Sequence, residues 1–66
     1  MQIQVNGHAH TVEPDLTVAT LLDILGYANK RVAVEINHCI VPRSQHAEHR
    51  LTEQDHIEIV QAIGGG

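Results

Sequence analysis

The residues with the clearest chemical meaning are Gly64, Gly65 and Gly66. Glycine loses more conformational entropy on ordering than any other residue and has no side chain to pack, so a glycine run contributes nothing to the stability of a fold. Three extended residues reach roughly 10 Å. Without Cβ atoms, such an arm fits a narrow channel and presents a terminal carboxylate to an enzyme. A frayed chain end is the alternative interpretation.

The carboxylate of Gly66 needs activation before it can act as an acyl donor, because an ionised carboxylate resists nucleophiles. ATP supplies such activation as an acyl adenylate, and an incoming sulfur nucleophile then leaves a thiocarboxylate. No helix or lysine follows the glycines, as a nucleotide-binding glycine loop would require. We therefore predict that the chain binds no cofactor and that a partner enzyme uses the ATP.

Six histidines raise the question of a metal site. His8 and His10 share a strand face, and His46 and His49 would share a helical face. A zinc site needs three or four convergent ligands, yet the sequence has no cysteine pair and no His-Glu-x-x-His motif. We expect surface histidines, with His10 partly packed, and no metal site.

The cysteine, Cys39, follows His38 in the sequence. Adjacent residues of an extended chain point to opposite faces, so this pair is badly placed for proton transfer. A single cysteine cannot form an intramolecular disulfide, which favours a reducing compartment, and we expect the cytoplasm. The sequence also lacks a signal peptide pattern and an apolar run long enough for a membrane helix.

Composition limits the architecture and the partners. Sixty-six residues, 42% of them hydrophobic and 18% charged, are typical of one small globular domain. The formal net charge is −4, and one Tyr is the whole aromatic content. Nucleic acid is therefore an unsuitable partner, because neither a basic patch nor stacking aromatics are present.

The first half of the chain predicts a hairpin followed by a helix. Residues 1–6 alternate apolar and polar side chains, and Asn6-Gly7 is typical of a type I′ turn, so residues 8–13 should return as an antiparallel strand. Thr17 is placed as an N-cap and Gly26 as a C-terminal stop. The core face of the helix is expected to carry Val18, Leu21, Leu22 and Leu25.

The second half predicts two further strands. Residues 32–37 alternate as a third strand, followed by a turn that contains Cys39, and Ile40-Val41 resumes the apolar character before Pro42. Residues 43–55 suit a loop with a short helical turn and one apolar anchor, Leu51. Residues 56–61 form the last strand, whose inward side chains are Ile57 and Ile59.

This order predicts an α+β roll in which one helix lies across one side of a four-stranded sheet. The first and last strands are expected side by side in the middle of the sheet. Residues 1–63 would form the domain, and residues 64–66 a flexible tail.

Three segments carry a resemblance to a known family. Residues 34–37, Ile40-Val41-Pro42-Arg43-Ser44 and residues 57–66, which end in Ala-Ile-Gly-Gly-Gly, resemble the ThiS family of bacterial sulfur carriers in thiamine biosynthesis. The resemblance runs the whole length and implies the β-grasp, ubiquitin-like fold: a four- to five-stranded mixed sheet with one main helix packed across one face. Ubiquitin-like modifiers and the small subunit of molybdopterin synthase share a terminal Gly-Gly and stay as alternatives. The Val-Pro-Arg-Ser and Ala-Ile-Gly-Gly-Gly segments together favour ThiS.

The resemblance implies a protein co-substrate rather than an enzyme. A ThiF-type adenylyltransferase would adenylate Gly66, a sulfur-donating enzyme would supply the sulfur of the thiocarboxylate, and the thiazole synthase ThiG would consume it. The expected partner contacts are Val60, Ala62, Ile63, Gly64, Gly65 and Arg43. A capped turn after Pro42 is the alternative interpretation of Arg43.

Val60 is expected to point away from the core, because the alternate residues of its strand point inward. We expect Ala9 and Ala33 across from it and Glu35 and Glu58 at the rim. Such a flat apolar patch is a surface that an activating enzyme can bury. A single exposed valine without a role is the alternative.

Overall fold

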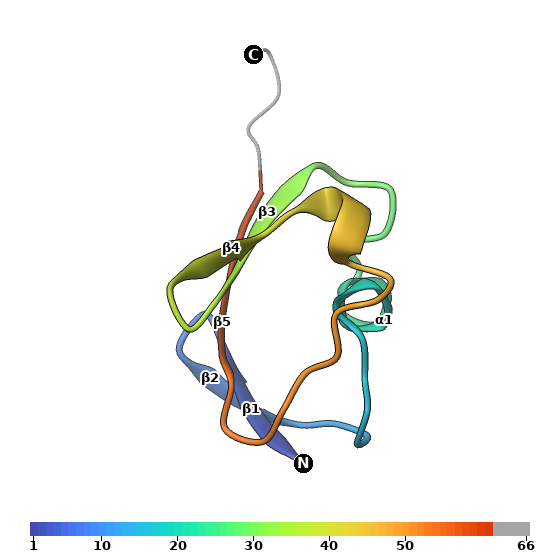
Figure 1. The fold of residues 1–66 in the computed structure, drawn as a ribbon. Helices are drawn as coiled ribbons and strands as arrows, with labels where there is room; N and C mark the ends of the chain where they lie inside the picture. The colour runs from blue at the N-terminus through green and yellow to red at the C-terminus, as the bar shows by residue number, and fades with distance from the viewer. Residues whose placement is uncertain (62–66) are drawn as a thin grey trace.

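The computed structural model describes residues 1–61, which form a five-stranded sheet and one α-helix (Figure 1). The strands are β1 (Gln2–Val5), β2 (His8–Thr11), β3 (Val32–Ile36), β4 (Cys39–Val41) and β5 (His56–Gln61). The helix α1 (Val18–Ile24) lies between β2 and β3 in the sequence, and a 3₁₀ helix, η1 (Arg43–Gln45), follows β4. The predicted tail and its junction, residues 62–66, lie outside the described residues.

The strand order across the sheet is β2-β1-β5-β3-β4. The first and last strands, β1 and β5, are parallel neighbours in the middle, as predicted, and the other pairs are antiparallel. This mixed sheet with one helix confirms the predicted fold class. Because β5 is central, its pairing holds the N-terminal hairpin and the β3–β4 hairpin together.

The first hairpin turns at Asn6-Gly7, as predicted. Both residues have positive φ, 50° and 83°, which a two-residue type I′ turn requires. β2 ends at Thr11, two residues before the predicted end. Val12 still donates its N–H to the carbonyl of Met1 at 2.8 Å, but the Pro14 that follows has no N–H to continue a ladder.

Helix α1 begins and ends where the sequence predicted. The Thr17 hydroxyl caps the N-terminus by accepting the Thr20 N–H at 3.2 Å. Gly26 has a φ of +85°, and the Tyr27 N–H donates to the Leu22 carbonyl at 2.8 Å, which is a Schellman C-cap. Within residues 1–61, no helix has the length and apolar composition needed to cross a membrane.

The segment after β3 differs from the prediction. β3 and β4 form a second hairpin in which Ile36 pairs with Cys39, so Cys39 begins a strand and does not lie in the turn. The turn is Asn37-His38, with φ of 51° and 70°. Asn and His are the side chains, besides glycine and Asp, that most often adopt this conformation. The Asn37 amide group fixes it by donating to the Asp55 carboxylate at 3.0 Å.

Helix α1 lies over one face of the sheet (Figure 1), and the buried side chains of the core come from both layers. Its buried hydrophobic residues come from all the elements except β2 and η1, and from the loops on both sides: Ile3, Val5, Leu16, Val18, Leu21, Leu22, Val34, Ile36, Val41, Leu51, Ile57 and Ile59. Leu51 is therefore the anchor predicted for residues 43–55. The predicted core residue Leu25 is only half-buried, because it is the C-cap where the helix leaves the sheet.

His46 corrects the expectation of surface histidines, because its side chain is buried. The ring Nε2–H donates at 3.1 Å to the carbonyl of Val41, the last residue of β4. This hydrogen bond gives that carbonyl a partner next to the core. His10 is half-buried, as predicted. The other buried polar residue, Asp55, accepts from the backbone N–H and the hydroxyl of Thr52, both at 2.8 Å.

Candidate functional site

The candidate site lies around the end of β5, the strand that leads toward Gly66. Ile57 and Ile59 are 2% and 5% exposed and face the core, whereas Val60 is 63% exposed. The predicted strand, its bounds and its phase are therefore confirmed. Because the described residues 1–61 place no second layer over the outer face, Val60 is available for contact.

On this outer face, Val60 is surrounded by residues of β3, β4 and its own strand β5. Ala33 of β3 is its direct partner, as predicted. One row away, Glu35 pairs with Glu58 on one side and with Ile40 of β4 on the other. Ile40 is 72% exposed. We call these five residues the outer patch: an apolar surface from three strands, crossed by two glutamates.

The prediction that Ala9 lies across from Val60 is wrong. Ala9 pairs with Gln4, and Gln4 pairs with His56 at the start of β5. Val60 is four residues further along that strand, which is about 13 Å at 3.3 Å per residue. The parallel pairing of β1 with the beginning of β5 sets this offset, and periodicity within one strand contains no information on it.

Ile40 is the member of the outer patch that the sequence prediction did not name. Its exposure follows from the second hairpin, because the pairing of Glu35 with Ile40 puts both side chains on the outer face. The usable signal was the alternation Cys39-Ile40-Val41 after a two-residue turn. It was missed because that turn contains no glycine.

The predicted reactive residue, Gly66, and the predicted contacts Gly64, Gly65, Ile63 and Ala62 lie outside the described residues. The last described residue, Gln61, pairs with Val32 at the beginning of β3. Gln61, the last described residue before the glycine segment (residues 64–66), is therefore adjacent to the outer patch, one residue beyond Val60.

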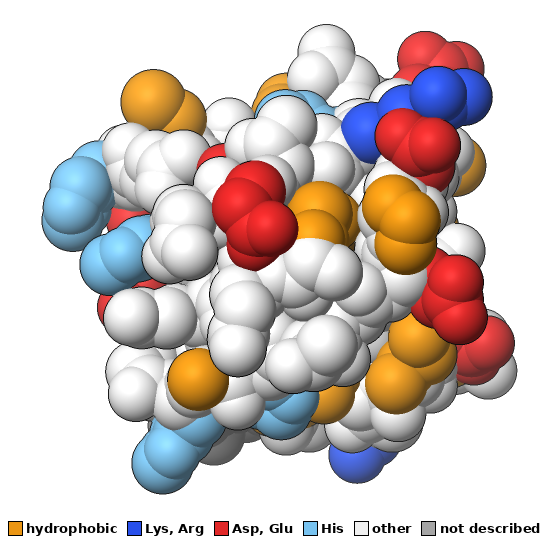
Figure 2. Space-filling model, turned by 90° about the horizontal axis from the view of Figure 1, so that it is seen from below, with side chains coloured by type: hydrophobic (Ala, Val, Ile, Leu, Met, Phe, Trp, Pro, Cys, Tyr) orange, Lys and Arg blue, Asp and Glu red, His pale blue; other side chains and the backbone are white. Residues whose placement is uncertain are grey.

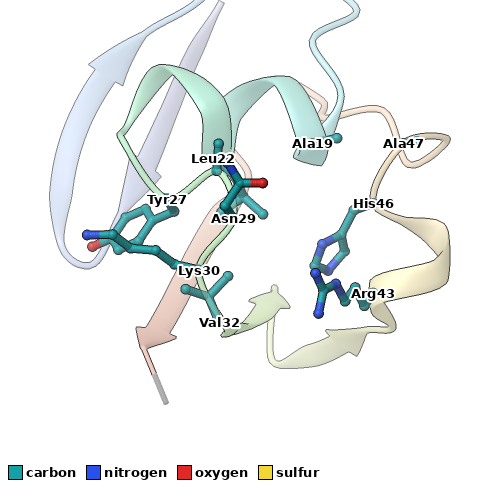
Figure 3. A pocket seen from close by; sticks show the side chains of 10 residues that line it. Ala19, Leu22, Tyr27, Asn29, Lys30, Val32, Arg43, His46 and Ala47 are labelled. Carbon is teal, nitrogen blue, oxygen red and sulfur yellow. The ribbon is translucent and has the colours of Figure 1, made fainter. Parts of the chain in front are cut away.

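Arg43 is exposed at the start of η1, directly after Pro42. It lines a pocket together with Lys30 and His46, on the helix side of the sheet (Figure 3). Arg43 is thus not part of the outer patch, and the structure places the predicted contacts Val60 and Arg43 on different sides of the sheet. Both sides nevertheless adjoin Val32, the residue that pairs with Gln61.

The other residues considered for chemistry do not assemble into a site. Within residues 1–61, no three His, Cys, Asp or Glu side chains come together in an arrangement that would hold a metal ion. Cys39 is a free, exposed cysteine at the start of β4, and His38 precedes it in the turn. Of the residues predicted for chemistry or contact, the described geometry therefore leaves the outer patch as the main candidate, while the glycine segment, residues 64–66, lies outside the described residues.

Known proteins resemble this chain over its whole length. The sequence matches the ThiS family over residues 3–66. The sulfur carrier protein ThiS of Escherichia coli (strain K12) is 39% identical, with all of both chains aligned. A thiazole synthase of Magnetococcus marinus is 44% identical over 66 residues, and the chain spans only 20% of that protein.

The fold is also found among solved structures. The crystal structure of the thiamine biosynthesis protein ThiS from Geobacter metallireducens aligns with a TM-score of 0.85 at 32% identity, covering 100% of both chains. The family match includes the outer patch and the whole glycine segment. The chain belongs to the ThiS family, whose model it matches over residues 3–66.

Proposed function

We propose that the chain carries sulfur for thiamine biosynthesis as a thiocarboxylate at Gly66. The observation that carries the proposal is the family match, which runs from residue 3 through Gly66 and so includes the glycine segment. The full-length alignment with a protein named as a sulfur carrier supports it. In this proposal, residues 1–61 form the surface that partner enzymes bind while they act on the carboxylate of Gly66.

The proposed chemistry has two steps at one carboxyl group. A carboxylate oxygen of Gly66 attacks the α-phosphorus of ATP in a ThiF-type adenylyltransferase, and pyrophosphate leaves. A sulfur-donating enzyme then delivers sulfur at the oxidation level of hydrosulfide, and this nucleophile attacks the carbonyl carbon of the acyl adenylate. AMP leaves, and the proton of the hydrosulfide passes to solvent. The product is the thiocarboxylate. The carrier supplies no catalytic group in either step, which is why it needs no cofactor of its own.

The outer patch is the proposed docking surface for the adenylyltransferase. Five residues such as 62–66 can span at most about 18 Å, so an enzyme holding the Gly66 carboxylate must lie close to Gln61. Val60 and Ile40 are the large exposed hydrophobic residues near that point. Burying them against an enzyme would remove apolar surface from water, which favours association.

Thiazole synthase ThiG is the proposed acceptor of the sulfur. The Magnetococcus marinus thiazole synthase contains a stretch similar to this entire chain in one fifth of its length. Two modules in one polypeptide meet at a high effective concentration, which is useful when one must deliver a reactive group to the other. We place this exchange in the reducing cytoplasm, where an exposed free cysteine such as Cys39 is ordinary.

Intact-mass spectrometry of the protein purified from cells tests the proposal. We expect a fraction of the chain to be heavier by the difference between one sulfur and one oxygen atom, located at Gly66 by fragmentation. Covalent adducts to lysines of other proteins would instead indicate a ubiquitin-like modifier. Co-purification in a stable complex with a molybdopterin synthase large subunit would indicate the other alternative. Either result would contradict the proposal.

A further inference from the structure

A pocket of about 260 Å³ lies between α1, the loop that follows it and η1. Its lining residues come from these three elements, from the turn that follows η1 and from the beginning of β3. The pocket is on the opposite side of the sheet from the outer patch. Neither the adenylation chemistry nor the glycine segment requires it.

The pocket combines apolar walls with positive charge. Figure 3 shows Arg43 and His46 on one side, Lys30 with Tyr27 on the other, and Val32 between them; the Lys30 ammonium lies beside the Tyr27 hydroxyl and points away from Arg43. None of the lining residues is Asp or Glu, although the chain has a net charge of −4. Two of its four Lys and Arg residues are at this one pocket.

The opposite end of the molecule has a different distribution of charge. Seen from the end away from Gln61, acidic side chains and histidines are spread over the face, and Lys and Arg are found only at its edges (Figure 2). A hollow lined by one sign of charge over low-dielectric walls concentrates the field and attracts ions of the other sign. The pocket therefore favours an anionic group.

The backbone that carries Arg43 is held in place before any ligand arrives. The His46 N–H donates to the Arg43 carbonyl at 3.1 Å, and the buried His46 ring is anchored on the Val41 carbonyl at 3.1 Å. The His46 carbonyl accepts the Ala19 N–H at 2.9 Å, which joins this segment to the start of α1. A pre-organised contact loses less entropy on binding than one on a mobile loop.

The position of the pocket points to the same partner that holds the glycine segment. Val32 lines the pocket and also pairs with Gln61, the last described residue before that segment. An enzyme around residues 62–66 therefore adjoins both the outer patch and the pocket. We propose that the pocket receives an acidic side chain, flanked by an apolar one, from the surface of the adenylyltransferase; this inference rests on the proposed function.

A carboxylate from a protein fits the chemistry of both parts of the pocket. The Arg43 guanidinium can bind a carboxylate with two parallel hydrogen bonds. The neighbouring apolar side chain of the partner would bury against Leu22, Tyr27 and Val32. A free anion such as phosphate would use the charges and leave these walls exposed.

Steady-state adenylation by the purified ThiF-type enzyme, followed as pyrophosphate release, tests the inference. Arg43→Glu should raise the KM for the carrier about tenfold, because it places like charges opposite each other, and should leave kcat unchanged. Arg50→Glu is the matched control, since Arg50 is exposed and lies outside this pocket. It makes the same change of net charge and should leave KM within about twofold of the wild type. Arg43→Lys should retain most of the wild-type affinity.

Two results would overturn the inference. One is an equal increase of KM for Arg43→Glu and Arg50→Glu, which would show that only net charge matters. The other is saturable movement of the Lys30 and Arg43 amide signals in NMR spectra when inorganic phosphate or ATP alone is added at submillimolar concentration. Failure of the wild-type chain to be adenylated at all is a different result, because it would contradict the proposed function itself.

Discussion

Neighbouring residues of β5 have opposite environments although their side chains are alike. Ile59 is 5% exposed and packs in the core, whereas Val60, also β-branched and aliphatic, is 63% exposed. The inner face of the strand contributes to the stability of the fold and the outer face does not. Because strand residues alternate, one six-residue segment serves as the centre of the domain and as a proposed contact surface.

Burial of side chains on the inner face stabilises the fold, whereas the pairing of like charges on the outer face destabilises it. Full burial of an Ile or Val side chain contributes roughly 1.5–3 kcal/mol to folding. On the outer face, Glu35 and Glu58 are direct cross-strand partners, and like charges in such a pair are destabilising. The outer face is therefore not optimised for stability, which is expected of a surface that serves another protein.

The largest effect is expected where the chain contributes least to stability. Deletion of Gly65 and Gly66 should abolish ATP-dependent adenylation completely, because the reacting carboxylate would be displaced from the enzyme's nucleotide site. The melting temperature should stay within a few degrees, since glycines bury no side chain. The assay is pyrophosphate release, with calorimetry for stability. A truncated chain that still acquires sulfur would contradict the proposed function.

On the inner side, Leu21→Ala should unfold a large part of the population. Leu21 is 1% exposed, and such a truncation costs roughly 2–5 kcal/mol. Small domains have a total stability near 5 kcal/mol. The matched control is Ile24→Ala in the same helix, because Ile24 is 64% exposed and should change stability by less than about 0.5 kcal/mol. Urea denaturation followed by circular dichroism measures both, and equal effects would show that burial does not govern this helix.

Local patterns were sufficient where one residue determines the conformation of its own turn or face. Asn6-Gly7 specified the first hairpin, Thr17 and Gly26 specified the helix ends, and the alternation in β5 specified which side chains are buried. These signals depend on neighbours within about four residues. The predicted surroundings of Val60 were correct where alternation determines them, because Ala33, Glu35 and Glu58 lie on the same outer face.

The features that could not be predicted depend on contacts between distant residues. Asn37 keeps its positive φ with the help of a hydrogen bond to Asp55, eighteen residues away. His46 is buried where its segment meets α1, because its carbonyl accepts the N–H of Ala19, and nothing in the segment's own sequence indicates this contact. The error at Ala9 has the same origin, because strand offsets are set by the pairing between strands.

The outer face can be tested by Val60→Asp, which should raise the KM for adenylation about fivefold to tenfold and leave stability nearly unchanged. The side chain is exposed, so the fold does not depend on it, but a charge in the outer patch must lose its water when the enzyme binds. Val60→Thr keeps the shape and tests polarity without charge; its effect should be smaller and of the same sign.

Thr11→Asp is the control for that experiment. Thr11 is exposed, and its pairing with Gln2 puts it on the same outer face, in the edge strand β2 and therefore away from Val60. It should leave KM unchanged. If Val60→Asp is adenylated at the wild-type rate under subsaturating carrier, or if Thr11→Asp is equally impaired, the docking surface is not the outer patch.

The smallest predicted effect is a gain in stability from Glu58→Gln. Glu58 is exposed and faces the half-buried Glu35 across the β3–β5 pair, so removing one charge should stabilise the fold by about 0.2–1 kcal/mol. Salt should reduce the gain, because ions screen the repulsion between exposed charges. Glu48→Gln makes the same change of net charge at an exposed position outside the strands and should give no comparable gain. Urea midpoints at low and high salt distinguish the cases: equal gains for both variants would attribute the effect to net charge, whereas a salt-sensitive gain at Glu58 alone would locate it in the cross-strand pair beside Val60.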